Sequence, residues 1–323
     1  MSLRRFPLVA TAATLAVLLL GASLRYPGFC SVAVFTHLFD DNAFLGVSAV
    51  GETFVILAGG IDLSVGSVIG LTSILSAVLV ERQGLSPFVV IPLVLALGST
   101  LGLAMGVLIR LFSLPPFLVT LAGMFLARGA AFIISLDSIA LQHPFYARAS
   151  AIPLLNAGIF LAAIALGSWA AGHTRFGRAV YALGGNAGSA SLMGLPVART
   201  QILVYTASGF CSALAGIIYT LYTSSGNASA ATGLELDAIA AVVIGGTILT
   251  GGAGHVLGTM LGVLILGAIQ TAITFEGTLS SWWTRIAVGA LLFAFVVLQR
   301  LINAGSRTTE AKAGNKPIAI AIG

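Results

Sequence analysis

Residues 87–110 read PFVVIPLVLALGSTLGLAMGVLIR, a run without a charged side chain before its last residue. A helix rises about 1.5 Å per residue, so a run of this length crosses the roughly 30 Å hydrocarbon core of a bilayer. Gly98, Gly102 and Gly106 recur at every fourth position and share one helix face, where a neighbouring helix can approach closely. The stretch therefore predicts a membrane-spanning helix packed into a bundle.

The composition of the whole chain agrees with this stretch. Of the 323 residues, 58% are hydrophobic and 8% are charged, and the mean hydropathy is +1.06. A soluble domain carries roughly 25% charged residues on its surface, so most of this surface must face membrane lipid. The 15 lysines and arginines lie singly or in pairs at the ends of apolar runs. They form no basic stripe of the kind that binds nucleic acid, so no nucleic-acid partner is expected.

Further apolar runs predict an all-α, polytopic membrane helix bundle of about ten transmembrane helices. The second, third and eighth runs are short or interrupted by glycine, so eight spans with re-entrant pieces are the alternative. The transmembrane domain is expected over 1–302 and a disordered cytoplasmic tail over 303–323. The predicted spans are residues 6–24, 42–58, 65–80, 87–110, 117–135, 153–171, 201–222, 236–250, 254–273 and 284–300.

Basic residues near span ends predict the orientation, because cytoplasmic loops carry an excess of lysine and arginine. They place both termini and the internal loop 173–200 in the cytoplasm, and an even number of spans on each side of that loop. Tyr222, Trp282 and Trp283 then fall at the outer interface, which favours amphipathic rings. The marking residues are Arg4, Arg5, Arg175, Arg178, Arg199, Arg300, Arg307, Lys312 and Lys316.

The chain lacks the motifs of an enzyme. It has no HExxH, no GxSxG and no phosphate-binding loop, and its two lysines, Lys312 and Lys316, both lie in the tail. Cys30 and Cys211 lack metal-ligand spacing, so we expect no metal site and no cofactor in this chain. Energy for uphill transport would come from a partner protein or an ion gradient.

Two carboxylates lie inside apolar stretches. An ion-coupled secondary carrier would use such groups in the membrane, so Glu52 and Asp62 make a carrier the alternative to a partner-driven transporter. The Gly59-Gly60 pair should interrupt the helix beside Asp62 and free backbone groups for polar side chains. We expect Asp62 to be the N-cap of the third span, with a transport role as the alternative. Glu52 is expected to make an interhelical hydrogen bond.

Two further patterns have structural consequences. Residues 56–70 align without gaps on 248–262 with all four glycines coinciding, which suggests an internal repeat of the kind found in transporters. In the loop 173–200 we expect a short helix over 187–193, ended by Gly194, that forms a compact knob at the membrane surface. A solvated connector without a partner is the alternative for this loop.

The sequence resembles the permease subunits of bacterial ATP-binding cassette (ABC) sugar importers of the ribose, xylose, arabinose and galactose group. Within the group it is most similar to a galactofuranose importer permease, through 41–46 (DNAFLG), 233–240 (GLELDAIA) and 275–284 (FEGTLSSWWT). The segments shared with the whole group are 54–67 (FVILAGGIDLSVGS), 116–124 (PFLVTLAGM), 174–186 (TRFGRAVYALGGN), 193–195 (MGL) and 243–252 (VIGGTILTGG).

The resemblance implies a multi-pass subunit of the inner membrane that translocates a monosaccharide. It also implies three partners: a second, different permease, with a homodimer as the alternative, an ATPase that binds ATP and Mg²⁺, and a periplasmic sugar-binding protein. The implied ATPase-coupling residues are Arg175, Phe176, Gly177, Gly184, Gly185, Asn186 and Gly194. The implied translocation path is shaped by Gly59, Gly60, Asp62, Ser64 and Gly66. Glu52 stands where the group has an uncharged Met or Gln; it would accept sugar hydroxyls if it faces the path, and it would be structural if it faces a neighbouring helix.

Overall fold

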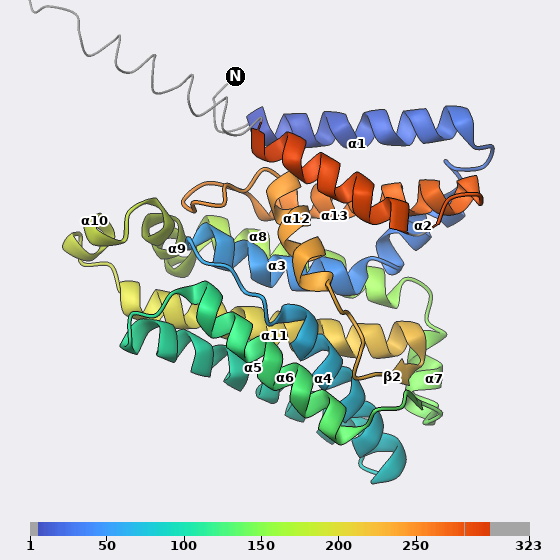
Figure 1. The fold of residues 1–323 in the computed structure, drawn as a ribbon, viewed down its shortest axis with the longest axis horizontal. Helices are drawn as coiled ribbons and strands as arrows, with labels where there is room; N and C mark the ends of the chain where they lie inside the picture. The colour runs from blue at the N-terminus through green and yellow to red at the C-terminus, as the bar shows by residue number, and fades with distance from the viewer. Residues whose placement is uncertain (1–5, 281, 298–323) are drawn as a thin grey trace, which may run out of the picture.

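A computed structural model describes residues 6–280 and 282–297, and in this part of the chain the architecture is helical (Figure 1). The predicted tail, 303–323, lies outside the described residues, as do Arg4 and Arg5. The helices are α1 (Phe6–Arg25), α2 (Val32–Asp40), α3 (Ala43–Leu57), α4 (Val65–Ala77), the π-helical turn η2 (Val78–Arg82), α5 (Pro87–Leu111), α6 (Pro116–Ile134), α7 (Pro144–Ser150), α8 (Leu155–His173), α9 (Arg175–Gly185), α10 (Ala187–Leu192), α11 (Val197–Thr223), α12 (Leu234–Ile244), α13 (Val256–Glu276) and an unlabelled last helix, Trp282–Val297.

Each of the ten predicted spans coincides with one of these helices, so the all-α, polytopic membrane bundle is confirmed. Within the described residues, 7 helices are long and apolar enough to cross a membrane, among them α4 continued by η2. The remaining spans correspond to the shorter helices α3, α12 and Trp282–Val297. The prediction for the eighth span was too long, because α12 ends at Ile244 and a glycine-rich loop replaces residues 245–250.

The helices form layers around α11, which packs on α3, α4 and α5 (Figure 1). The glycine stripe of α5 packs on a neighbouring helix, as predicted, and that helix is α11: a Cβ on Gly98 would lie 2.5 Å from the carbonyl oxygen of Gly209. A Cβ on Gly106 would lie 2.9 Å from the Cα of Ile202. The stripe therefore lets the α5 and α11 backbones approach more closely than any larger side chain permits.

Two short buried helices, α3 and α12, end in the same way. Gly59 and Gly246 both adopt left-handed φ values, +84° and +92°, at the helix end. The amides of Gly60 and Thr247, one residue further on, donate to carbonyls five residues back, at Val55 and Val242. These are two Schellman motifs, which need glycine at the left-handed position.

After each motif a loop leads into a long helix, α4 or α13. The helix–break–helix unit thus occurs twice, as the predicted internal repeat suggests. The ungapped alignment places Gly66 opposite Gly258 near the starts of the second helices. The same alignment does not pair the ends of α3 and α12, Gly59 and Gly246, because the loop before α13 is longer than the loop before α4.

The bundle has two distinct ends (Figure 1). At one end lie α9, α10 and the start of α1; at the other lie α2, α7 and a two-residue strand pair, β1 (Ile139–Ala140) with β2 (Ser225–Gly226). We name the first the inner end and the second the outer end, following the predicted orientation. Tyr26, directly after α1, bonds through its hydroxyl to Glu276 at the end of α13, so both helices finish at the outer end.

Candidate functional site

A buried polar cluster holds the break between α3 and α4. The Asp62 carboxylate accepts hydrogen bonds from the Ser64 amide at 2.9 Å, the Ser64 hydroxyl at 2.6 Å and the Ser208 hydroxyl at 2.7 Å. The Asp62 amide in turn donates to Oε1 of Glu52 at 3.2 Å. All four residues are at most 1% exposed. The cluster satisfies backbone groups that the helix break releases, as buried polar groups require.

The sequence expectation for Asp62 needs a correction. The residue at the N-cap position of α4 is Ser64, and Asp62 binds its amide from two residues earlier. This is the local turn that Asp side chains form, and it positions the helix start without capping it. Glu52 makes a contact with the loop between α3 and α4, and its Oε2 has no partner among the described residues.

Three backbone segments meet at the inner side of this break, in a contact that we call the glycine junction. The Gly252 amide donates to the Leu57 carbonyl at the end of α3, at 2.9 Å. A Cβ on Gly184, in α9, would collide with the same carbonyl and lie 2.5 Å from the Gly252 nitrogen. A Cβ on Gly251 would lie 2.8 Å from the Gly59 nitrogen. Glycine is required because α3, α9 and the loop before α13 touch backbone to backbone.

The helices α9 and α10 are each fixed by local caps. Thr174 accepts the Gly177 amide at 3.1 Å at the start of α9, where a Cβ on Gly177 would collide with the end of α8. Asn186 accepts the Ser189 amide at 2.8 Å at the start of α10. Gly194, at φ +75°, ends α10 in a third Schellman motif. The predicted helix over 187–193 is therefore present, and α9 before it was missed by the sequence analysis.

The helices α9 and α10 together form the predicted knob, and its exposed surface carries apolar and basic side chains. Leu192 is 92% exposed and Met193 is 69% exposed, and Arg175 is exposed on α9. Phe176 points inward and packs its ring 5.6 Å from that of Phe54. Exposed apolar side chains beside charged ones are typical of a protein interaction surface. Of the residues predicted for coupling, Phe176, Gly177 and Gly184 lie in internal contacts, whereas Arg175, Gly185, Asn186 and Gly194 are exposed.

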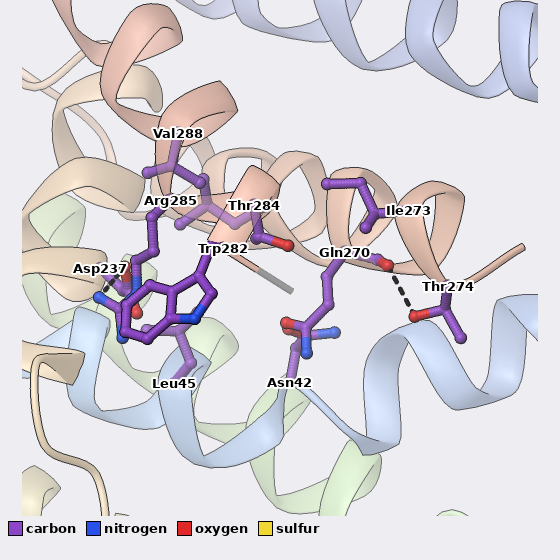
Figure 2. Close-up of a pocket in the computed structure, with 11 residues that line it drawn as sticks. Asn42, Leu45, Asp237, Gln270, Ile273, Thr274, Trp282, Thr284, Arg285 and Val288 are labelled. Atoms are coloured by element: carbon purple, nitrogen blue, oxygen red, sulfur yellow. Dashed lines mark hydrogen bonds and ion pairs between the residues drawn. The ribbon is translucent and has the colours of Figure 1, made fainter. Parts of the chain in front are cut away.

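A cavity of about 350 Å³ with a mixed polar and apolar lining opens at the outer end, and we call it the outer cavity (Figure 2). It lies between the start of α3, the end of α13 and the last helix. Arg285 and Asp237 form an ion pair across it, with 3.5 Å between Nη1 and Oδ1. Its polar and aromatic lining consists of Asn42, Asp237, Gln270, Thr274, Trp282, Thr284 and Arg285. An adjoining cavity of about 510 Å³ shares five of the lining residues of the outer cavity.

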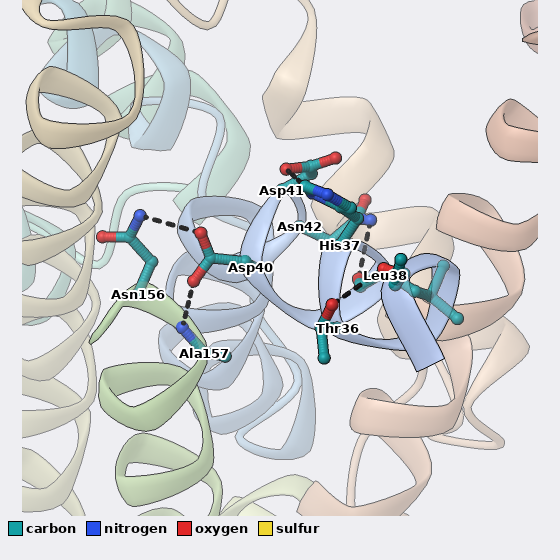
Figure 3. A network of polar contacts seen from close by, with 9 residues as sticks. Thr36, His37, Leu38, Asp40, Asp41, Asn42, Asn156 and Ala157 are labelled. Carbon is teal, nitrogen blue, oxygen red and sulfur yellow. Dashed lines mark hydrogen bonds and ion pairs between the residues drawn. The ribbon is translucent and has the colours of Figure 1, made fainter. Parts of the chain in front are cut away.

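Figure 3 shows a network that holds the wall of the adjoining cavity. Asp40, the last residue of α2, accepts the Ala157 amide at 3.0 Å and the Asn156 side chain at 3.4 Å. It thereby binds one of the free backbone amides in the first turn of α8, where a carboxylate is favoured. His37 lies 3.8 Å from Asp41. Burial raises the pKa of the Asp41 carboxyl above its ordinary value, an effect that His37 opposes and Asp40 increases.

One residue of the outer cavity, Trp282, was predicted individually from the sequence, as an interfacial ring. The segments that carry the galactofuranose resemblance also contain Asn42, Asp237 and Thr284. Asn42, Asp237, Gln270 and Arg285 come from separate segments, and no spacing along the chain reveals that they meet. Glu52 and Asp62 line neither of the two outer-end cavities. Among the described residues, no group of three or more His, Cys, Asp or Glu is placed to hold a metal ion.

Comparison with known proteins identifies the class to which these features belong. The profile of the family described as "Branched-chain amino acid transport system / permease component" matches residues 41–296. This range includes the interrupted helices, the α9–α10 knob and every lining residue of the outer cavity. The chain therefore belongs to this family of transport-system permease components, and it is a multi-pass membrane protein.

Several curated relatives align over nearly their full length. The chain is 49% identical to "Inner membrane ABC transporter permease protein YjfF" of Escherichia coli K12, over 92% of each chain. It is 39% identical to "Fructose import permease protein FruG" of Bifidobacterium longum, over 92% of this chain and 91% of that one. It is 35% identical to "Ribose import permease protein RbsC" of Escherichia coli K12, over 88% and 91%. No solved structure gives a significant match to the chain.

Proposed function

We propose that this chain is the permease subunit of an ATP-driven importer of a monosaccharide in the bacterial inner membrane. The observation that carries the proposal is the glycine junction: the knob that would face a cytoplasmic ATPase touches the ends of the interrupted helices directly. The relatives support the same reading, since their names describe ABC transport and the import of fructose and ribose. In this proposal ATP and Mg²⁺ bind the partner ATPase, and this chain holds no cofactor.

The junction supplies a mechanical route for coupling. Closure of the ATPase would displace α9, and α9 cannot move without shifting the Leu57 carbonyl and the Gly252 amide that it packs against. Protein interiors are close-packed and transmit such displacements instead of absorbing them. The break in α3–α4 and the loop before α13 would therefore move together, and access to the path would alternate between the two sides of the membrane.

We further propose that the sugar is galactofuranose. The segments that carry the likeness to a galactofuranose importer permease are 41–46, 233–240 and 275–284, which are distant in sequence. All three contribute residues to the outer-end cavities, for example Asn42, Asp237 and Trp282. A likeness concentrated around one polar cavity is expected where segments share a ligand. The same resemblance favours a heterodimer with a second permease and supply by a periplasmic sugar-binding protein.

The test is purification of the tagged chain from its native host in mild detergent, followed by mass spectrometry of the bound proteins. We expect an ATPase and a second permease in fixed ratio. Recovery of the ATPase with this chain alone would indicate a homodimer. An intact complex without any ATPase would overturn the proposal and favour an ion-coupled carrier.

The proposed docking of the ATPase on the knob can be tested with a separate variant, Gly185→Trp. A Cβ on Gly185 meets nothing within 4 Å, so Gly185→Trp projects outward from the knob and should abolish ATPase recovery without disturbing the bundle. Gly129→Trp, on the exposed face of α6, is the matched control, because Gly129 also has free space within 4 Å. Normal ATPase recovery and uptake with Gly185→Trp would contradict the assignment.

A further inference from the structure

We propose that the outer cavity is a binding site for one uncharged monosaccharide ring within the permease itself. This inference rests on the proposed function and deepens it, because it names the residues that contact the sugar and the charge class of sugar that fits. Ligand sites are concave pockets of about 300 to 1,000 Å³ with a few convergent polar groups. The outer cavity, at about 350 Å³, lies in that range and is large enough for a single ring rather than an oligosaccharide.

The lining matches the chemistry of a sugar. Each sugar hydroxyl is both a donor and an acceptor, and so it pairs best with groups that offer both functions. The amides of Asn42 and Gln270 and the hydroxyl of Thr284 offer both, and they reach the cavity from the turn before α3, from α13 and from the last helix (Figure 2). Thr274, one turn after Gln270 on α13, donates its hydroxyl to the Gln270 carbonyl and lines the cavity as an acceptor. Trp282 adds a broad ring with an apolar face, on which the carbon–hydrogen face of a sugar can lie.

The charges of the lining select against anionic ligands. Asp237 and Arg285 are the charged residues of the outer cavity, and they neutralise each other at 3.5 Å. The adjoining cavity adds Asp41, which lies 3.8 Å from His37. A sugar phosphate or a sugar acid would thus find no unpaired cation in the lining, and its charge would have to be desolvated without compensation. A neutral sugar can instead donate to the Asp237 carboxylate and accept from Arg285.

The position of the cavity also fits a substrate site. Asn42 directly precedes α3, whose 15 residues are almost all buried and end at Leu57 in the glycine junction. At about 1.5 Å per residue, this rigid helix places the two sites about 22 Å apart. A ligand at Asn42 and a displacement at Leu57 therefore act on opposite ends of one helix, so movement at the inner end can open or close the site.

The test measures protection of an introduced cysteine by sugar. Gln270→Cys is made in a Cys30→Ser, Cys211→Ala background, since Cys30 is exposed, and the complex is purified from the native host with its partners. A charged methanethiosulfonate reagent labels the cysteine with and without D-galactose or D-ribose. We expect a sugar at about twice its Kd to slow labelling about threefold. Galacturonate and galactose 6-phosphate should not slow it.

Trp283→Cys is the control, because Trp283 is half exposed on the last helix, next to Trp282, and lines neither cavity. Its labelling should be independent of sugar. In uptake assays Trp282→Ala should raise KM about tenfold, whereas Trp283→Ala should leave it unchanged; tenfold corresponds to about 1.4 kcal/mol.

Two results would overturn the inference at different levels. If the complex imports neutral sugar but Gln270→Cys is labelled equally at every sugar concentration, the cavity is not the site and the proposed function stands. If the intact complex imports no sugar at all, the proposed function fails and the inference fails with it. Equal protection by galacturonate would contradict the charge argument alone.

Discussion

The amide of Gly252 donates a hydrogen bond of 2.9 Å to the carbonyl oxygen of Leu57. This bond connects the end of α3 to the loop before α13, and the Cα of Gly184 packs over it. Two interrupted helices, separated by almost 200 positions in the sequence, are therefore joined at the place where α9 contacts the bundle.

Gly184→Ala should destabilise the protein, whereas Gly185→Ala should not. A methyl group at 184 collides with the Leu57 carbonyl, and overpacking of this kind costs about 1–3 kcal/mol. A methyl group at 185 points into open space. The measurement is the thermal unfolding temperature of the detergent-purified complex. Equal unfolding temperatures for the two variants would show that the junction is not tightly packed.

Asn186→Ala should lower transport without changing the unfolding temperature of the bundle. The substitution removes the hydrogen bond to the Ser189 amide and weakens the start of α10, a loss of about 0.5–2 kcal/mol confined to an exposed six-residue helix. Asn186→Ser should restore uptake, because serine is also a good N-cap. If Asn186→Ala transports at the wild-type rate, the shape of α10 has no part in coupling.

Leu192→Asp should prevent recovery of the ATPase with the permease. Leu192 is 92% exposed on the knob, and a buried unpaired carboxylate at a protein interface is costly. Leu136→Asp is the control, since Leu136 is 78% exposed in the segment after α6, away from α9 and α10. The readout is the ratio of ATPase to permease after purification. Loss of the ATPase with both variants would indicate a general assembly defect.

Asp62→Ala should destabilise the protein more than Ser208→Ala. The first variant removes the acceptor for the buried Ser64 amide and for two hydroxyls, and each buried group left without a partner costs about 1–3 kcal/mol. The second removes one donor and leaves the carboxylate two others. Unfolding temperatures compare the two. A larger effect from Ser208→Ala would contradict the network described for the break.

Glu52→Gln should leave ATP-driven uptake unchanged. Glutamine keeps the oxygen that accepts the Asp62 amide and nearly the same volume, but it cannot carry a proton. The measurement is uptake into proteoliposomes with ATP supplied to the ATPase side, with and without an imposed proton gradient. Uptake that is driven by the gradient alone, and that is lost with Glu52→Gln, would establish the ion-coupled alternative.

The membrane-spanning helices were predictable because each one is encoded locally, whereas the shorter α2, α7 and α9 were not predicted. A run of about 20 apolar residues forms a spanning helix in a bilayer, and the glycine stripe of α5 indicates which face of that helix packs on a neighbour. The end of α12 was less predictable, because Gly245, Gly246 and Thr247 are followed by further apolar residues and average hydropathy does not register the left-handed turn.

The candidate sites were predictable only in part. Gly59 and Gly184 were named for separate roles, and nothing in the sequence shows that their α-carbons are neighbours. The outer cavity depends on Asn42, which was noted only within the segment 41–46, and on Gln270 and Arg285, which no motif of the sequence marks. Such sites arise from tertiary packing, so a single sequence carries no periodic signal for them.

The glycine junction is built from main-chain atoms alone, so its residues cannot be substituted while the two ends of the protein evolve. Such a contact cannot change by small steps in sequence, because any side chain at position 184 would collide with the Leu57 carbonyl. The knob and the cavity are attached to that fixed hinge from either side, and each can change independently. Chimeras in which residues 174–195 come from a relative with the same glycine junction should therefore assemble as working transporters.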